Sequence, residues 1–455
     1  MMYRTRGRAS GAAAQQFRAN LRKKVPSTYV YTYPFKGAYR PLNEMNLIAR
    51  AWQDVCGLVN IYVHVPYCEM KCSFCNLFTT TRHNAGAFEQ YTNAVIREAQ
   101  LVAHTMRADQ LFTDSVYFGG GTPSLLPTEA VARIAAELRA LFPLSEGAEL
   151  AIETAPNAVD DEKLRELRSI GIDRISIGVQ SFDARELQMM RRAYKPDLSE
   201  RTISAALAAG FSNVNVDLIY GLPGQTDRTW RANLELAVAL GVPTITIYPL
   251  TLRERTAFGN QHRKAPAAFD LGATTYRRYD VAEEFLTDNG YHQYSMSGFA
   301  RHGGGSRHEC NEFMGVPTVG LGASALSYAP DIHYTSGDYL DSRSPSSLIA
   351  DYIQSVEASC IPIHTGILLS REERQRRHLI MRLLYQGVDL EEYGRTFGES
   401  LEDRFGSELE ALAQEECVCA KEGWLALSPR GRRFSSLVAD LLASATVKCL
   451  ARAYK

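Results

Sequence analysis

Short runs of β-branched residues alternate with helix-like stretches from Leu58 onward. This alternation is typical of βα units and a parallel sheet. The predicted strands cover 60–65, 115–118, 150–154, 174–178, 213–218 and 244–248, and the predicted helices cover 88–104, 128–141, 160–170, 198–209 and 229–240. Six consecutive units predict an α/β fold, a partial (β/α)6 barrel of the TIM type. In such a barrel we expect the active groups at the C-terminal edges of the strands.

The remaining segments have different patterns, and we expect five parts in all. They are a disordered basic arm (1–26), an N-terminal covering segment (27–57), the barrel (58–255), a β-rich extension over the barrel mouth (256–364) and a C-terminal helical domain (365–455). The extension is predicted to hold a helix over 276–289 and a strand over 292–296.

In the C-terminal domain, helices over 371–385 and 402–422 precede a short hairpin near 424–431, which suggests a winged-helix-like module. A winged helix can bind DNA, but a fold does not fix a function. The mixed charge signs of this segment favour a structural or substrate-covering role.

Composition narrows the class of protein. The 455 residues carry 50 Lys and Arg against 51 Asp and Glu, so net charge calls for neither nucleic acid nor membrane lipid as a partner. No apolar run approaches the roughly 18 residues of a membrane helix. The nine cysteines form no regular framework, which indicates a reducing compartment and a cytoplasmic protein. The first 24 residues are basic without an acidic residue, and their composition fits a mobile arm better than a transit peptide.

The strongest chemical signal is the loop that follows the first predicted strand. Cys68, Cys72 and Cys75 lie on it with C-x3-C-x2-C spacing. Thiolates are the usual ligands of iron–sulfur clusters, and three of them leave one iron of a four-iron cluster open for a substrate or cofactor. A zinc knuckle or three unrelated cysteines are the alternatives, although zinc normally needs a fourth ligand and only His83 follows nearby.

This loop, with Phe74 before its last cysteine, resembles the signature of radical S-adenosylmethionine (SAM) enzymes. The resemblance implies a 4Fe–4S cluster whose open iron binds SAM, and a flavodoxin- or ferredoxin-type electron donor. The preceding 62–67 segment, Tyr-Val-His-Val-Pro-Tyr, is similar to the oxygen-independent coproporphyrinogen III oxidase-like branch, in which two SAM molecules lie side by side.

Several polar residues near strand ends are further candidates for the SAM-binding site. Gly119–Pro123 form a glycine-rich turn after the second strand, which resembles the superfamily's motif for the amino end of SAM but could simply turn the chain. Glu153 and Gln180 end two later strands. Asp217 lies within an apolar strand, where burial costs several kcal/mol unless it is paired, so we expect a partner such as an arginine.

The branch resemblance implies contacts to both SAM molecules. For the cluster-bound molecule they are Tyr62, Gly120, Glu153 and Leu326, and for the second molecule Phe74, Gly121, Thr122, Gln180, Arg192, Asp217 and Thr251. Phe74 could instead pack under the loop. No catalytic side chain is assigned.

The residues after the cluster loop, Asn76-Leu77-Phe78-Thr79, differ from those of the decarboxylating oxidase and of the heme chaperone in this branch. Together with Tyr-rich 27–34 they resemble the class C radical SAM methylases and cyclopropanases. That resemblance implies transfer of a one-carbon unit from SAM to an sp2 carbon of a natural-product intermediate.

Two other functions remain open. Oxidative decarboxylation of a porphyrinogen would need cationic groups for the substrate's carboxylates. Heme binding and delivery would need an axial ligand such as His302, His308 or Cys310, which lie in a segment that could equally be a flexible surface loop.

Overall fold

The computed structural model describes residues 11–25, 29–42, 47–106, 108–192, 194–337 and 343–453. Its strands are β1 (Arg40–Pro41), β2 (Gly57–Val65), β3 (Leu111–Gly120), β4 (Leu144–Thr154), β5 (Arg174–Gln180), β6 (Asn213–Tyr220), β7 (Thr244–Pro249), β8 (His292–Gln293), β9 (Gly298–Ala300), β10 (Thr318–Leu321), β11 (Leu326–Tyr328), β12 (Ile332–Thr335), β13 (Thr365–Leu368), β14 (Val388–Asp389), β15 (Val418–Lys421) and β16 (Trp424–Leu427).

The α-helices are α1 (Gly11–Lys23), α2 (Leu47–Trp52), α3 (Ala85–Met106), α4 (Thr128–Leu141), α5 (Asp161–Ser169), α6 (Ala184–Met189), α7 (Pro196–Ala208), α8 (Asp227–Ala239), α9 (Ala257–Lys264), α10 (Ala273–Asp288), α11 (Arg307–Met314), α12 (Pro345–Glu357), α13 (Arg371–Leu383), α14 (Leu390–Phe397), α15 (Leu401–Gln414), α16 (Pro429–Arg433), α17 (Ser435–Leu442) and α18 (Ala445–Arg452). Among the described residues, no helix has both the length and the apolar character needed to cross a membrane.

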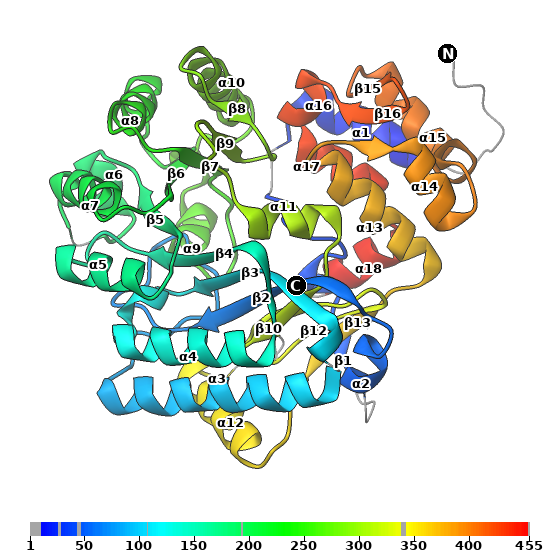
Figure 1. Ribbon diagram of the computed structural model, residues 1–455. Coiled ribbons are helices and arrows are strands. Elements are labelled where there is room, and N and C mark those ends of the chain that lie inside the picture. The colour runs from blue at the N-terminus through cyan, green and yellow to red at the C-terminus, as the bar shows by residue number, and fades with distance from the viewer. Residues whose placement is uncertain are drawn as a thin grey trace.

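The six predicted βα units form the centre of one curved sheet. Strands β2 to β7 pair in parallel and in chain order, and α3, α4, α5, α7 and α8 cover their outer side (Figure 1). The expected partial barrel is therefore confirmed. Each of the six predicted barrel strands lies inside an observed one, and the helix expected over 128–141 matches α4 in both bounds. The strand expected over 292–296 is observed only at its first two residues, as β8.

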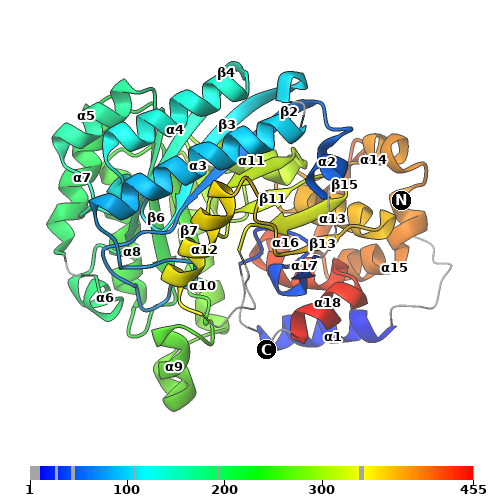
Figure 2. The same cartoon turned by 90° about the horizontal axis from the view of Figure 1, so that it is seen from below.

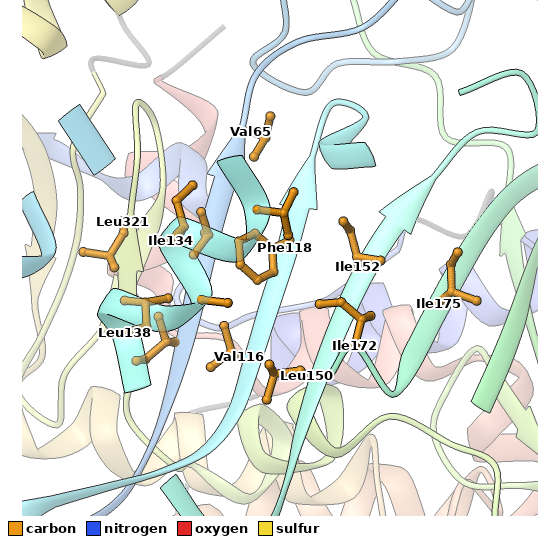
Figure 3. Close-up of a cluster of buried hydrophobic side chains, with 14 of the residues drawn as sticks. Val65, Val116, Phe118, Ile134, Leu138, Leu150, Ile152, Ile172, Ile175 and Leu321 are labelled. Carbon is orange, nitrogen blue, oxygen red and sulfur yellow. The ribbon is translucent and has the colours of Figure 1, made fainter. Parts of the chain in front are cut away.

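The two faces of these strands differ sharply in polarity. Outward-facing residues such as Val116, Phe118, Leu150 and Ile152 pack with Ile134 and Leu138 of α4 (Figure 3). Inward-facing residues of the same strands are polar; they include Asn60, Tyr62, Ser115, Tyr117, Glu153, Ser176, Asn215, Asp217, Thr246 and Tyr248. The inner face thus forms a polar lumen instead of the apolar interior that fills most small barrels.

The extension is β-rich, as expected, but its strands do not form a cap over the barrel mouth. Strand β10 pairs in parallel with β2, and β11, β12, β13 and β1 continue that edge in antiparallel order. At the opposite edge, β9 and β8 pair antiparallel beyond β7. The extension therefore lengthens the sheet at both edges, because each edge strand of an open barrel offers unpaired backbone groups.

Helix α11 crosses the inner face of the sheet and fills part of the lumen (Figure 1). Ser115 Oγ lies 2.7 Å from His308 Nδ1, and Asn311 Nδ2 donates to Asn60 Oδ1 at 3.0 Å. Residues 307–310 are therefore part of a packed helix, and the idea that this whole segment is a flexible surface loop is wrong.

The N-terminal arm was expected to be disordered, which is wrong for residues 11–23. They form α1, whose Ala14, Phe17 and Leu21 are buried in a core shared with the C-terminal domain. Their spacing of three and four residues places them on one face of a helix. Residues 1–10 and 26–28 lie outside the described residues.

The covering segment bridges the barrel and the C-terminal domain. The Tyr29 ring lies edge-on to that of Tyr248 on β7, with centroids 5.1 Å apart. Tyr33 is fully buried, and its hydroxyl donates to Glu373 Oε2 at 2.5 Å and accepts from the backbone of Ser444. These aromatic residues therefore hold the segment in place.

The C-terminal domain combines helices α13 to α18 with the small sheet β14–β16–β15. The helix expected over 402–422 ends at Gln414, so its second half is a wrong prediction. There the chain forms the hairpin β15–β16, in which Glu422 and Gly423 both have positive φ, as a two-residue turn of type I′ requires.

The packing of α1 can be tested with Phe17→Ala. Removing this buried ring should lower the free energy of unfolding by about 3 kcal/mol, because it leaves a cavity in the shared core. Urea denaturation followed by far-ultraviolet circular dichroism measures the change. The exposed neighbour Gln15→Ala should change stability by less than about 0.5 kcal/mol; equal effects of the two substitutions would contradict a docked α1.

Candidate functional site

The three-cysteine loop leaves the C-terminal end of β2 and is fastened on two sides. The backbone of Cys68 donates to Thr80 O at 3.0 Å. Ser73 donates through its backbone to Met190 O at 3.1 Å and through Oγ to Met189 O at 2.9 Å. The loop therefore holds Cys68, Cys72 and Cys75 in a fixed arrangement at the edge where active groups of a barrel collect.

All three thiols are free and only partly exposed. Burial raises the pKa of Cys68 to about 12 and also raises the pKa of Cys75. Burial lowers the pKa of the Arg192 guanidinium, but the neighbouring Cys72 and Tyr194 together outweigh this effect, so the net shift of the Arg192 pKa is upward. Thiols in such surroundings are deprotonated by the metal that they bind, so cluster loading releases their protons.

The donor set fits a four-iron cluster better than a single ion. In the described part of the chain, no three His, Cys, Asp or Glu side chains converge as ligands of one metal ion. His83, the nearby residue that could supply a fourth zinc ligand, instead stacks on Phe88 with ring centroids 5.0 Å apart. A cluster takes each thiolate on a different iron, so its ligands need not converge on one point.

Gly121 allows the glycine-rich turn to pass close to the backbone at the start of the cysteine loop. Its backbone donates to Val65 O at 2.8 Å, and a Cβ at this position would lie 2.5 Å from Tyr67 O and 3.0 Å from Cys68 Sγ. Thr122 lies beside it, with Oγ1 3.8 Å from Cys68 Sγ. A side chain at residue 121 would therefore displace the first cluster ligand.

Gly120 serves the lumen side of the same turn. Its φ of 112° is a backbone conformation that glycine adopts without strain. A Cβ at this position would lie 2.6 Å from the ring of His64. Its N–H donates to Glu153 Oε2 at 3.0 Å, while Tyr117 donates to Glu153 Oε1 at 2.9 Å. Burial, reinforced by the charge of Asp217, raises the pKa of Glu153 to about 7.

Asp217 is satisfied by neutral donors. Asn215 Nδ2 donates to it at 2.8 Å and Ser176 Oγ at 3.2 Å, and burial raises its pKa. No arginine lies within salt-bridge distance of Asp217 in the described residues, so the expected arginine partner is wrong. A carboxylate held by neutral donors remains available to a cation.

Gln180 and Arg192 meet at the end of β5. Gln180 has a φ of 69°, in the left-handed region that costs a residue other than glycine of order 1 kcal/mol or more. The guanidinium of Arg192 donates to Gly178 O and to Tyr194 Oη, both at 2.5 Å. Its Nε is buried without a hydrogen-bond partner among the described residues, which leaves one donor for a ligand.

The other predicted contacts lie around this edge. Tyr62 donates to or accepts from His64 Nδ1 at 3.1 Å. Leu326 lies against Gly320, which is paired in register with Tyr62, and Thr251 follows the end of β7. Phe74 packs against the apolar cluster that contains Met190 and Phe258, so the structure has it under the loop. Its contact with an adenine stays a prediction.

Sequence reasoning missed the supporting residues His64, Tyr117, Ser176, Asn215 and Tyr194. Four of the five lie on the inner face of a strand, and Tyr194 follows Arg192. A period of two that places polar residues inside was the available signal: counted back from Asp217 it reaches Asn215, and counted back from Gln180 it reaches Ser176. Burial lowers the pKa of His64 to about 4, so its imidazole is neutral at physiological pH.

Two family models match the chain. The model described as the radical SAM superfamily matches residues 62–237, and the model described as the HemN C-terminal domain matches 369–434. The first range holds the cysteine loop and the polar edge. The second holds α13 to α16, which explains the winged appearance of this domain.

Several curated relatives carry the name heme chaperone HemW. Heme chaperone HemW of Bacillus subtilis is 26% identical over 82% of this chain and 95% of its own length. Heme chaperone HemW of Mycobacterium tuberculosis is 32% identical over 59% of this chain and 69% of its own. Among solved structures, coproporphyrinogen III oxidase (HemN) of Escherichia coli matches 91% of this chain and 97% of its own, with a TM-score of 0.79 and 23% identity, which shows a shared fold.

These matches overturn the expected C-methyltransferase or cyclopropanase function. The relatives are named heme chaperones, and the C-terminal family model is that of HemN. The expectation rested on two short stretches, the Tyr-rich segment 27–34 and the residues after Cys75, and two of the latter, Asn76 and Leu77, are exposed. Exposed loop residues vary easily, so they are a weak guide to chemistry.

The cluster assignment predicts a clear mutational result. Alanine at Cys68, Cys72 or Cys75 should reduce bound iron from about four atoms per chain to nearly none after anaerobic reconstitution, because too few thiolates remain. Cys419→Ala is the matched control, since this thiol is exposed and far along the chain on β15. Iron analysis with the visible spectrum measures both. Iron loss in Cys419→Ala equal to that in Cys72→Ala would refute the three-thiolate site.

Glu153 predicts a pH dependence of SAM binding. SAM carries positive charge, so it binds the ionised carboxylate of Glu153 better than the protonated form. Below its pKa of about 7 the Glu153 carboxyl group of the free protein is protonated, and it must release this proton when SAM binds. Affinity should rise as pH rises from about 6 to about 7, by at most tenfold per pH unit. Equilibrium binding to cluster-loaded protein measures this rise.

Glu153→Gln should flatten that profile, whereas Glu146→Gln, at an exposed position of the same strand, should leave it intact. A profile that is equally steep in the Glu153 variant would remove this residue from the SAM site.

Proposed function

Because this chain belongs to the radical SAM superfamily, in its HemN-like branch, we propose that it binds heme and passes it on, as its HemW relatives are named for doing. The observation that carries the proposal is the match to a curated heme chaperone over 95% of that protein's length. The family's 4Fe–4S cluster and SAM accompany this function. The likeness to HemN supports the fold alone, so we propose no decarboxylation.

The residues assigned to the cluster and to SAM are different from the residue that would ligate heme iron. Cys68, Cys72 and Cys75 are assigned to the cluster, and the inner ends of β3 to β6 are assigned to SAM. Heme iron needs its own axial ligand, for which His, Cys, Met and Tyr are the usual choices. The segment 301–310 offers three of them.

Their surroundings favour His302. The His308 ring is buried against Ser115 at 2.7 Å, and burial lowers its pKa to about 3. Burial raises the pKa of the Cys310 thiol to about 11, so this thiol is protonated at physiological pH. His302 has an exposed side chain in the turn 301–306, which leads into α11. An exposed imidazole can reach a heme iron without unpacking a helix, so we assign it the axial position.

The test is a heme titration of the cluster-loaded protein, read as a difference spectrum in the Soret region. The wild-type chain should bind one heme saturably. His302→Ala should weaken binding by about tenfold or more, since it removes the proposed iron ligand. The matched control is His292→Ala, an exposed histidine on β8.

Each alternative result has a definite meaning. Absence of saturable binding by the wild-type chain would contradict heme delivery. Equal affinities of the two variants, with wild-type binding intact, would keep heme binding but reject His302 as the ligand.

A further inference from the structure

Glu98 is a buried carboxyl group on α3, outside the set of polar residues that face the lumen. Its Oε2 accepts two hydrogen bonds, one from the backbone N–H of Gly322 at 2.6 Å and one from the Tyr352 hydroxyl at 2.7 Å. Val95 and Val102 of the same helix belong to the surrounding apolar core, and burial raises the pKa of Glu98 to about 7. A carboxyl group in such surroundings is costly unless it is hydrogen-bonded, so these two bonds are what stabilise it there.

Tyr91 makes matching contacts two turns earlier on α3. Its hydroxyl accepts from the backbone N–H of Ala323 at 2.9 Å and donates to His64 O at 2.7 Å. Glu98 and Tyr91 are seven residues apart, which places them on the same face of the helix. Helix α3 therefore binds two consecutive N–H groups of one turn and the penultimate residue of β2.

The turn that these side chains bind, residues 322–325, joins β10 to β11. Strand β10 runs parallel to β2, so the turn lies at the same edge of the sheet as the cysteine loop. A Cβ on Gly322 would lie 2.5 Å from His64 O, and Ser324 has a φ of 68°, in the left-handed region. A residue in that region costs of order 1 kcal/mol and persists only where its surroundings fix it. The two side chains of α3 provide this fixation.

Helix α12 packs beside α3 (Figure 2) and connects the same place to the cysteine loop. Besides the bond from Tyr352 to Glu98, Ser346 Oγ at the start of α12 lies 3.0 Å from Thr80 Oγ1. The backbone carbonyl of Thr80 in turn accepts from the N–H of Cys68. Two helices, the 322–325 turn and the cysteine loop are therefore fastened to one another around a single buried carboxyl group.

We propose that Glu98 is a positioning residue for SAM: without touching SAM, it holds the 322–325 turn against the end of β2, and the turn forms one wall of the SAM site. Active groups of a barrel collect at this edge. Leu326, a predicted contact of the cluster-bound SAM, directly follows the turn. This role requires only the superfamily's cluster and SAM, and it is independent of heme binding.

The test compares Glu98→Leu with Glu98→Gln in the cluster-loaded full chain. Leucine keeps the bulk of the side chain but accepts no hydrogen bond, so the Kd for SAM should rise about tenfold. Glutamine still has an oxygen that can accept both bonds, so its Kd should stay within about threefold of the wild-type value. Bound iron should stay at about four atoms in both variants, because no cluster ligand is changed. The shift of the cluster's electron paramagnetic resonance signal should need correspondingly more SAM in Glu98→Leu alone.

Two further variants separate positioning from a general loss of stability. Phe17→Ala removes a buried ring from the core shared with the C-terminal domain, and it should bind SAM as the wild-type chain does. Tyr91→Phe removes the acceptor of the Ala323 N–H and should weaken SAM binding in the same direction as Glu98→Leu, and it decides the matter if Glu98→Leu does not fold.

Unchanged SAM affinity in folded Glu98→Leu and in Tyr91→Phe would overturn the proposal. An equal loss of SAM affinity in Phe17→Ala would do the same, since the effect would then follow stability alone. Loss of iron together with SAM binding in Glu98→Leu would also overturn it, because Glu98 would then support the cluster loop and not the SAM site.

Discussion

The need to satisfy buried polar groups on the inner face of the sheet governs this molecule. Strands β3 to β6 turn apolar residues outward to their helices, so the opposite residues, Glu153 and Asp217 among them, must face the lumen. A buried carboxylate is costly without partners. Tyr117, Gly120, Ser176 and Asn215 supply those partners as neutral donors, and the carboxylates keep their capacity to bind a cation.

The same requirement explains the rest of the architecture. Helix α11 occupies the lumen because His308 and Asn311 can bond to Ser115 and Asn60. The covering segment reaches the lumen with Tyr29. The cysteine loop lies at the edge of this polar space, at the C-terminal end of β2.

Local patterns predicted what local forces determine. The central strands and most of their helices follow from the hydrophobic period, so the barrel could be predicted from the sequence, whereas the cluster ligands assigned from the cysteine spacing stay a prediction. Long-range pairing could not: β10 lies beside β2 although more than 250 residues separate them, and α1 looks like a polar arm until its Phe17 meets the C-terminal core. The hairpin after Gln414 depends on the positive φ of Glu422, an unusual residue for that turn.

The cofactors were predicted correctly and the function was not, while the individual site residues stay predictions. Cluster ligands follow a spacing that chemistry imposes, whereas the choice among activities rested on exposed residues such as Leu77. A match to a relative along most of its length carries more information than such short stretches, because it includes the residues of the lumen, the extension and the C-terminal domain.

The central claim is that the three-cysteine loop holds a cluster whose open iron faces the SAM side of the lumen. Electron paramagnetic resonance of the reduced, reconstituted protein, recorded with and without SAM, tests it most directly. Binding of SAM to the open iron should shift the g-values of the cluster signal, and Glu153→Gln should weaken the SAM concentration dependence of that shift. Identical spectra with and without saturating SAM would contradict the account.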